Sequence, residues 1–210
     1  MSTDAYHHNH VGAGADRPLL FLFHGTGGNE DQFMDIGAAL IPRATLVAPR
    51  GDVSEQGAAR YFRRAAEGIY DMGDLTRATG KMAGFVRAHI DSAKPSSVHG
   101  LGYSNGANIL ANVIFANPGL FDTATLMHPL IPFAPEIDGL LSTRILITAG
   151  RADPICPPEL TAQLETALLG AGADLRTVWH DGGHELRKGE FDAARILLAD
   201  YAESAKEQIL

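Results

Sequence analysis

Cysteine is almost absent from this sequence, because Cys156 is the single one among its 210 residues. One thiol excludes an internal disulfide and any metal site built from several thiolates. Two interpretations of Cys156 stay open, a small apolar filler of the core and a residue at the edge of a pocket.

Basic side chains and long apolar runs are also scarce. The 17 Lys and Arg residues stand against 25 Asp and Glu, which gives a formal net charge of −8. A field of this sign repels phosphate backbones, so we expect no nucleic-acid partner. No apolar stretch approaches the roughly 18 residues of a membrane-spanning helix, and the first ten residues lack the apolar core of a signal peptide. We therefore expect no membrane partner and a cytoplasmic protein.

The composition is otherwise that of an ordinary globular domain. Hydrophobic residues make up 45% of the chain and charged residues 20%, close to the averages for folded proteins. No internal repeat, low-complexity tract or linker-like run divides the chain. We predict one domain over residues 1–210, in which residues 1–16 are either an edge strand or a flexible start.

Short apolar runs alternate with segments of helical periodicity. The run Pro18–Phe23 has no polar residue in alternation, which predicts a strand buried on both faces. The segment Leu75–Ile90 has apolar residues at spacings of three and four, which predicts a helix that ends before Pro95. Comparable patterns predict strands over residues 45–48, 97–101, 123–127, 144–149 and 175–179, and helices within residues 109–115, 160–168 and 191–201. The alternation predicts an α/β fold with a mostly parallel central sheet, helices on both faces, and a ligand site beyond the carboxyl ends of the strands.

The segment Pro49–Gly73 has weak periodicity and is longer than the roughly 12 to 15 residues of most unstructured loops. Two interpretations are open, a flap that faces the substrate and a surface excursion held by salt bridges. In the first, Arg63 or Arg64 would meet an acidic group of the substrate, because a guanidinium suits planar anions. Tyr70 is a further candidate substrate contact in this segment.

A GxSxG pattern, formed by Gly102, Ser104 and Gly106, lies between a predicted strand and a predicted helix. A nucleophile at such a turn needs a strained backbone, and its neighbours pack so closely that residues with little or no Cβ are required. The alternative is an ordinary glycine-rich turn. The strand before it and the helix after it favour Ser104 as a catalytic nucleophile.

A serine hydroxyl needs an imidazole to take its proton and an acid to orient that imidazole. In the strand-turn-helix context of GxSxG, the acid and then the histidine follow the serine on later strand ends. Asp153 in GRADPICP fits the acid, and His184 in DGGHEL fits the base. His180 is the rival base, although its place at a strand end suits a structural histidine. Asp181 is the rival acid, but its place on the histidine's own loop suits a turn carboxylate.

Backbone amides that would hold a negative oxygen are predicted at two places. The HGTGG sequence of residues 24–28 follows the first long strand and matches the HGGG-type loop of esterases, so Thr26 would donate one N–H. Asn105, next after Ser104, would donate the other. A phosphate-binding loop is the alternative for HGTGG, which lacks the lysine and the glycine spacing of that motif. His24 is expected to shape this loop.

The remaining histidines give no predicted metal site. His7, His8 and His10 are accompanied by no carboxylate motif, so we expect them to be inert or part of an edge strand. His128 follows a predicted strand, and it either lines the pocket or is a satisfied buried polar residue.

The motifs HGTGGNEDQF, APRG, YFRR, EGIYD, GYSNGAN, GRADPICP and GGHEL occur in this order. On these motifs the chain resembles the phospholipase/carboxylesterase family of small α/β hydrolases over nearly all of Pro18–Tyr201. Within it, the chain is similar to bacterial carboxylesterases described as hydroquinone-linked or dienelactone-hydrolase-like, which are related to acyl-protein thioesterases. The resemblance implies the α/β-hydrolase fold without a large lid domain. Dienelactone hydrolases use a cysteine nucleophile, where this chain has serine.

The resemblance also implies a cofactor-free esterase with the triad and oxyanion donors named above. We expect a serine carboxylesterase that hydrolyses small to medium esters through an acyl-enzyme intermediate. Two alternatives stay open, an acyl thioesterase or lysophospholipase-type hydrolase and a non-catalytic ligand-binding protein of the same fold. The expected partner is a small ester, a homodimer is possible, and neither the natural substrate nor the oligomeric state follows from the sequence.

Overall fold

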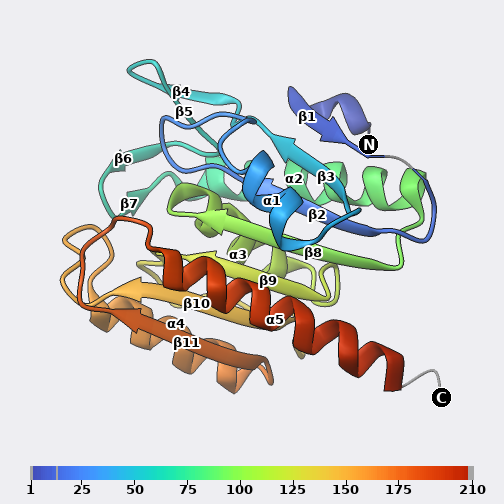
Figure 1. The fold of residues 1–210 in the computed structure, drawn as a ribbon. Helices are drawn as coiled ribbons and strands as arrows, with labels where there is room; N and C mark the ends of the chain where they lie inside the picture. The colour runs from blue at the N-terminus through green and yellow to red at the C-terminus, as the bar shows by residue number, and fades with distance from the viewer. Residues whose placement is uncertain (1, 13, 208–210) are drawn as a thin grey trace.

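The apolar runs form one seven-stranded sheet in the computed structural model, which describes residues 2–12 and 14–207 (Figure 1). The strand order is β1-β3-β2-β8-β9-β10-β11, with β1 antiparallel to β3 and every other neighbouring pair parallel. The strands are β1 (His8–Val11), β2 (Pro18–Phe23), β3 (Thr45–Pro49), β8 (Ser97–Tyr103), β9 (Thr123–Met127), β10 (Arg144–Gly150) and β11 (Asp174–His180). The predicted α/β fold with a mostly parallel central sheet is confirmed.

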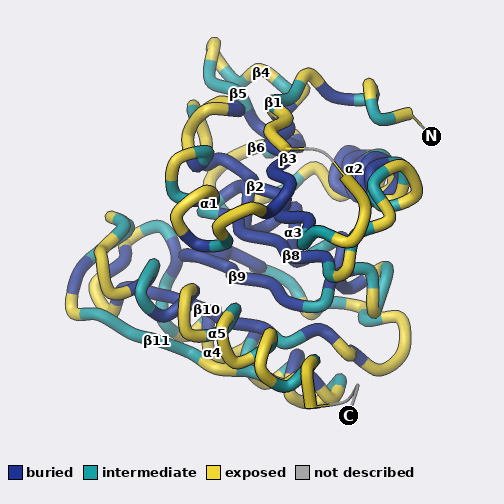
Figure 2. Tube along the Cα trace, turned by 45° about the vertical axis from the view of Figure 1, so that its right-hand side comes forward, coloured by how far each residue is buried: buried dark blue, intermediate teal, exposed yellow. Residues whose placement is uncertain are grey.

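Helices cover both faces of the sheet, as predicted, and its inner strands are buried, whereas the edge strands β1 and β11 are partly exposed (Figure 2). They are α1 (Met34–Leu40), α2 (Met72–Ala93), α3 (Asn105–Ala116), α4 (Pro158–Gly170) and α5 (Lys188–Glu207). Helices α2, α3 and α4 contribute to one core cluster, and α1 and α5 to the other. None of the described helices is long and apolar enough to span a membrane.

Strand β2 is buried on both faces, which confirms the interpretation of its unbroken apolar run. Leu19, Phe21 and Phe23 belong to the cluster under α2 and α3, whereas Leu20 and Leu22 belong to the cluster under α1 and α5. This division follows from the period of two, since successive side chains of a strand point to opposite faces.

Within the start of the chain, residues His8–Val11 form an edge strand, which is one of the two predicted alternatives. β1 pairs with β3 in a register that places His8 opposite Pro49, and a short 3-10 helix (Thr3–Ala5) precedes it. Between the two, Tyr6 is buried and its ring meets the Phe85 ring edge-on, with 5.4 Å between centroids.

The segment Pro49–Gly73 contains two small hairpins, and their short strands explain its weak periodicity. They are formed by β4 (Val53–Glu55) with β5 (Ala58–Arg60), and by β6 (Arg64–Ala66) with β7 (Ile69–Tyr70). An ion pair between Arg64 Nε and Glu55 Oε1, 3.0 Å apart, joins the two hairpins. The carboxyl ends of the parallel strands lie on the same side of the molecule as these hairpins, at the left of Figure 1.

Candidate active site

Ser104 occupies the turn between β8 and α3 in a backbone conformation that few non-glycine residues adopt. Its φ is 52° and its ψ is −117°, which lies outside the regions that are relaxed for L-residues. A Cβ on Gly102 would lie 2.5 Å from the carbonyl oxygen of Gly106, and a Cβ on Gly106 would lie 2.3 Å from that of Phe23. Both positions therefore require glycine, as the GxSxG pattern predicted.

The structure brings Ser104, His184 and Asp153 into one chain of hydrogen bonds. His184 Nε2 lies 3.0 Å from Ser104 Oγ, and His184 Nδ1 lies 2.7 Å from Asp153 Oδ2. One tautomer of the imidazole serves both contacts, since Nδ1–H donates to the carboxylate while Nε2 accepts from the hydroxyl. Asp153 follows β10 and His184 follows β11, so the carboxyl ends of neighbouring strands bring them together. This arrangement can transfer the serine proton to the imidazole.

The two rival residues take no part in this chain. His180 Nδ1 accepts the Gly182 N–H at 3.0 Å, and its Nε2 lies 3.4 Å from that of His128. Asp181 is exposed and pairs with Arg151 over 3.7 Å. Their interpretation as a structural histidine and a solvent-facing carboxylate agrees with these contacts.

The carboxylate of Asp153 is buried but fully hydrogen-bonded. Its Oδ1 accepts the amides of Ile155 at 2.8 Å and Cys156 at 2.9 Å. Its Oδ2 accepts from His184 and, at 2.9 Å, from His128 Nδ1. Burial would raise the pKa of this carboxyl, but these hydrogen bonds outweigh burial and hold the pKa of Asp153 below its usual range. The carboxylate is therefore ionised at neutral pH.

His128 lies behind the carboxylate, with no exposed side-chain surface. Its Nδ1 faces Asp153, and its Nε2 lies 3.1 Å from Glu190 Oε2. Burial would lower the pKa of His128, but the hydrogen bonds to Glu190 and Asp153 raise it overall. The prediction that His128 lines the pocket is wrong, because its ring is enclosed between two carboxylates and does not reach the cavity. The alternative interpretation, a satisfied buried polar residue, describes it.

Glu190 was missed by the sequence reasoning. It lies in the first turn of α5 and is 1% exposed, where it accepts from the Arg187 amide at 2.7 Å and from the Thr148 hydroxyl. No local pattern marks it, because it lies one residue before the predicted helical segment 191–201 and its partners come from other elements.

Thr26 and Asn105, the predicted oxyanion donors, are both near the serine. Both residues line the cavity that contains Ser104, and neither N–H donates to an acceptor among the described residues. Asn105 is the first residue of α3, where the helix dipole favours negative charge. The arrangement can therefore hold an oxyanion.

His24 fixes the loop that carries Thr26. Its Nδ1 donates to Gly25 O over 2.7 Å, and its Nε2 accepts the Gly51 N–H at 2.9 Å. Burial lowers the pKa of His24, so the ring is neutral and holds this one tautomer. The expectation that His24 shapes the loop agrees with these contacts.

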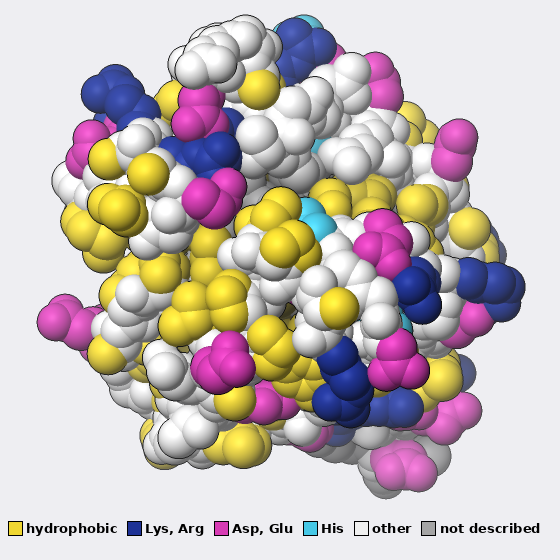
Figure 3. Space-filling view, turned by 90° about the vertical axis from the view of Figure 1, so that its left-hand side faces the viewer, with side chains coloured by type: hydrophobic (Ala, Val, Ile, Leu, Met, Phe, Trp, Pro, Cys, Tyr) yellow, Lys and Arg dark blue, Asp and Glu magenta, His cyan; other side chains and the backbone are white. Residues whose placement is uncertain are grey.

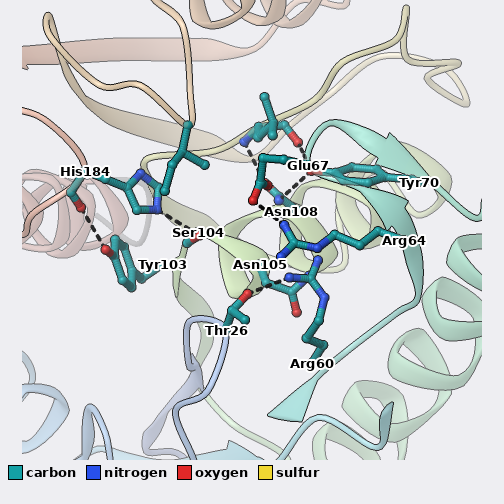
Figure 4. A pocket seen from close by; sticks show the side chains of 12 residues that line it. Thr26, Arg60, Arg64, Glu67, Tyr70, Tyr103, Ser104, Asn105, Asn108 and His184 are labelled. Carbon is teal, nitrogen blue, oxygen red and sulfur yellow. Dashed lines mark hydrogen bonds and ion pairs between the residues drawn. The ribbon is translucent and has the colours of Figure 1, made fainter. Parts of the chain in front are cut away.

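The cavity in front of Ser104 has a volume of about 270 Å³ (Figure 4). Arg64 and Tyr70, two of the candidate substrate contacts, line it, and so does Arg60, which the sequence analysis did not single out. The prediction that Arg63 contacts the substrate is wrong, because its side chain is exposed outside the cavity. Its amide donates to Asp74 Oδ2 at 2.7 Å. The cavity is lined by Thr26, Arg60, Arg64, Glu67, Tyr70, Tyr103, Ser104, Asn105, Asn108, Leu130, Ile155 and His184.

Cys156 is a buried filler rather than a pocket residue. Its Sγ lies 3.2 Å from His128 O and 3.8 Å from His184 Nδ1. Burial raises the pKa of the thiol, which leaves it protonated and unreactive at neutral pH.

Comparison with known proteins identifies the family. No protein-family model matches the chain. MhqD of Bacillus subtilis (strain 168), provisionally named a hydrolase, is 36% identical over 185 residues, which cover 87% of this chain and 92% of MhqD. This chain is a small α/β hydrolase of the phospholipase/carboxylesterase type.

Two solved structures of small α/β hydrolase fold are similar to it. The protein Atu2452 of Agrobacterium tumefaciens str. C58, of unknown function, is 57% identical with a TM-score of 0.91, over 96% of this chain and 99% of that one. The Bacillus cereus carboxylesterase is 32% identical with a TM-score of 0.88, over 93% and 94%. In this small α/β hydrolase the loops after β2, β8, β10 and β11 carry the candidate site, and the described residues form no large lid domain.

Proposed function

We propose that this protein is a serine carboxylesterase that hydrolyses small to medium carboxylic esters through an acyl-enzyme intermediate. The observation that carries the proposal is the hydrogen-bonded series from Ser104 Oγ through His184 to Asp153, which lies at the wall of a cavity. Membership of the family supports hydrolysis of ester bonds, since its relatives include a carboxylesterase and a protein named esterase.

In the first step Ser104 Oγ attacks the ester carbonyl while His184 Nε2 takes the hydroxyl proton. The carbonyl oxygen becomes negative and accepts the amides of Thr26 and Asn105, each donor contributing roughly 3 to 4 kcal/mol to the transition state. The imidazolium then gives its proton to the leaving alkoxide, so the alcohol departs neutral and the acyl group stays on Ser104.

In the second step water replaces the alcohol. His184 takes a proton from the water as its oxygen attacks the acyl carbonyl, and it returns that proton to Ser104 Oγ as the acid leaves. Asp153 keeps its negative charge throughout and stabilises the imidazolium through Nδ1. The cycle consumes water and needs no cofactor.

The experiment is turnover of p-nitrophenyl butyrate by wild type, Ser104→Ala and the control Ser92→Ala, whose side chain is exposed on α2. We expect the Ser104→Ala variant to lose activity on the order of 10⁴-fold or more, and the Ser92→Ala variant to retain it. Near-normal turnover by a folded Ser104→Ala variant would refute the proposal. Butyryl and longer acyl thioesters, measured beside the oxygen esters, separate the thioesterase alternative.

A further inference from the structure

Arg60 places a buried guanidinium beside the candidate nucleophile. Its side chain is 3% exposed and lines the cavity of Ser104. Nη1 donates to Thr26 Oγ1 at 2.7 Å, and Nε donates to Phe62 O at 3.4 Å. A guanidinium removed from water is costly unless an anion compensates it.

The carboxylate near Arg60 is shared with a second guanidinium. Glu55 Oε2 lies 3.6 Å from Arg60, whereas Arg64 Nε lies 3.0 and 3.1 Å from the two Glu55 oxygens. Burial and the neighbouring Arg64 charge both lower the pKa of Arg60. Glu55 therefore compensates Arg64 better than Arg60, whose ion pair with Glu55 is the longer of the two at 3.6 Å.

A second carboxylate, that of Glu67, is bonded to Arg64 Nη1 from the turn between β6 and β7. The Glu67 side chain is half exposed and lines the cavity. Pairs with one exposed partner contribute little to stability, because water competes for both charges. Glu67 can therefore leave Arg64 for solvent when another anion enters the cavity.

We propose that Arg60 and Arg64 form an anion subsite that binds a carboxylate carried by the ester substrate. Figure 4 shows the two guanidinium groups pointing into the cavity from β5 and β6, on the side of Ser104 away from His184. Arg60 is hydrogen-bonded to the side chain of Thr26, whose amide would hold the ester carbonyl oxygen. A carboxylate bound by Arg60 would therefore lie next to the reacting ester. The substrate class is the half-esters of short dicarboxylic acids, whose acyl part fits a cavity of about 270 Å³.

The subsite works by local geometry rather than by the overall charge of −8. That charge acts weakly at a distance, since ions screen exposed charges beyond about 8 Å at physiological ionic strength. The planar guanidinium forms paired, charge-assisted hydrogen bonds with a carboxylate, and these strengthen in a site that excludes water. The proposal rests on the serine esterase function proposed above and specifies its substrate.

The test compares monomethyl glutarate with its neutral isostere methyl glutaramate, and acid release is followed by titration. We expect wild type to favour the acidic ester, and Arg60→Met and Arg64→Met each to lower the acidic-to-neutral ratio of kcat/KM by about tenfold or more. Arg63→Met is the matched control, because the same charge is removed from the exposed neighbour outside the cavity. Its ratio should stay within twofold of wild type. Glu67→Gln should raise the ratio.

Binding of glutarate, measured by calorimetry, gives a readout that does not require turnover. Wild type and Arg63→Met should bind glutarate, whereas Arg64→Met should not. Because Arg64 is more exposed than Arg60, the Arg64→Met variant still tests the subsite if Arg60→Met fails to fold. Equal ratios and equal glutarate binding across the Arg60, Arg63 and Arg64 variants would overturn the subsite. If wild type hydrolyses neither these esters nor p-nitrophenyl butyrate but glutarate still binds, the esterase proposal fails and the anion subsite stands.

Discussion

At the scale of single residues, the electrostatics of the site depend on His128 and Glu190, two side chains that the cavity does not expose. His128 lies between Asp153 and Glu190, so both of its ring nitrogens face carboxylate oxygens at 2.9 and 3.1 Å. The hydrogen bonds to both carboxylates raise the pKa of His128 and favour its protonated form, and an imidazolium between two carboxylates leaves a net negative charge beside His184. That charge favours the imidazolium that His184 would become during the proposed reaction.

The first prediction concerns stability of Glu190→Gln. Burial would raise the pKa of Glu190, but its hydrogen bonds lower it overall, and the pKa of His128 is raised. The carboxylate stabilises the fold above its unfolded pKa and loses this effect as the pH falls through the folded pKa. His128 stabilises below its unfolded pKa, about 6.5, and loses the effect as the pH rises through its folded pKa.

Glu190→Gln should therefore lower the free energy of unfolding most between roughly pH 4.5 and 6.5. The loss there should be about 3 kcal/mol, as expected when one partner of a buried pair is removed, and it should shrink at both extremes. Urea unfolding from pH 3 to 9 measures it, with Glu203→Gln on the exposed face of α5 as control. A loss that does not vary with pH would contradict the charged His128–Glu190 pair.

The second prediction concerns the glycine before the serine. Gly102→Ala should destabilise the fold by about 1–3 kcal/mol or more, because its Cβ would lie 2.5 Å from the Gly106 carbonyl oxygen. Gly80→Ala is the matched control in the interior of α2, where a Cβ meets nothing within 4 Å. That change should stabilise by up to about 1 kcal/mol. Similar effects of both substitutions on thermal unfolding would contradict the close packing at the turn.

Sequence reasoning located some residues of the site and missed others for a physical reason. Ser104, Asp153 and His184 each lie after a strand that the sequence predicts, and parallel strands bring their carboxyl ends together. Arg63 and Arg64 are adjacent in a segment without a readable period, so only the hairpin geometry decides which one enters the cavity. Glu190 depends on a packing contact between α5 and β10, which no local pattern contains.

At the scale of elements, length and period decided what could be predicted. The helix that ends before Pro95 was confirmed because it has a long apolar pattern and a clear stop, and the short strand Thr123–Met127 was confirmed as well. Helix α1 was not predicted, since it spans seven residues and contains Gly37. The two hairpins were not predicted either, because strands of two or three residues show no alternation.

The third prediction tests how β1 is held at the edge of the sheet. Tyr6→Ala should lower the free energy of unfolding by about 3 kcal/mol, since the ring is 3% exposed and packs on Phe85. Tyr6→Phe should be neutral or stabilising, because the buried hydroxyl has no partner among the described residues. Val11→Ala at the exposed end of β1 is the control. Urea unfolding would contradict this account if Tyr6→Phe cost as much as Tyr6→Ala.

At the scale of the whole molecule, the proposed reaction uses only side chains and amides of this chain. His128, His180 and Glu190 place their ligand atoms within 4.8 Å of one another, as a metal site would. Protons compete with a metal ion for these atoms, since both His128 nitrogens face carboxylate oxygens and the pKa of His128 is raised. His180 Nδ1 accepts from the Gly182 amide, which leaves the proton on Nε2.

The fourth prediction follows from these protons. Dialysis against EDTA should change neither turnover of p-nitrophenyl butyrate nor the melting temperature, because protons rather than a cation hold the cluster together. Activity that falls on chelation and returns with added zinc would contradict this.

The proposed mechanism requires that Ser104 become acylated during turnover, and mass spectrometry of the trapped protein can detect that acyl group. Wild type treated with a fluorophosphonate, or acid-quenched during turnover of p-nitrophenyl acetate, should carry one adduct on the peptide that contains Ser104. Ser104→Ala should carry none. An adduct on another side chain, such as Cys156, or undiminished ester hydrolysis by Ser104→Ala without any adduct, would contradict the account.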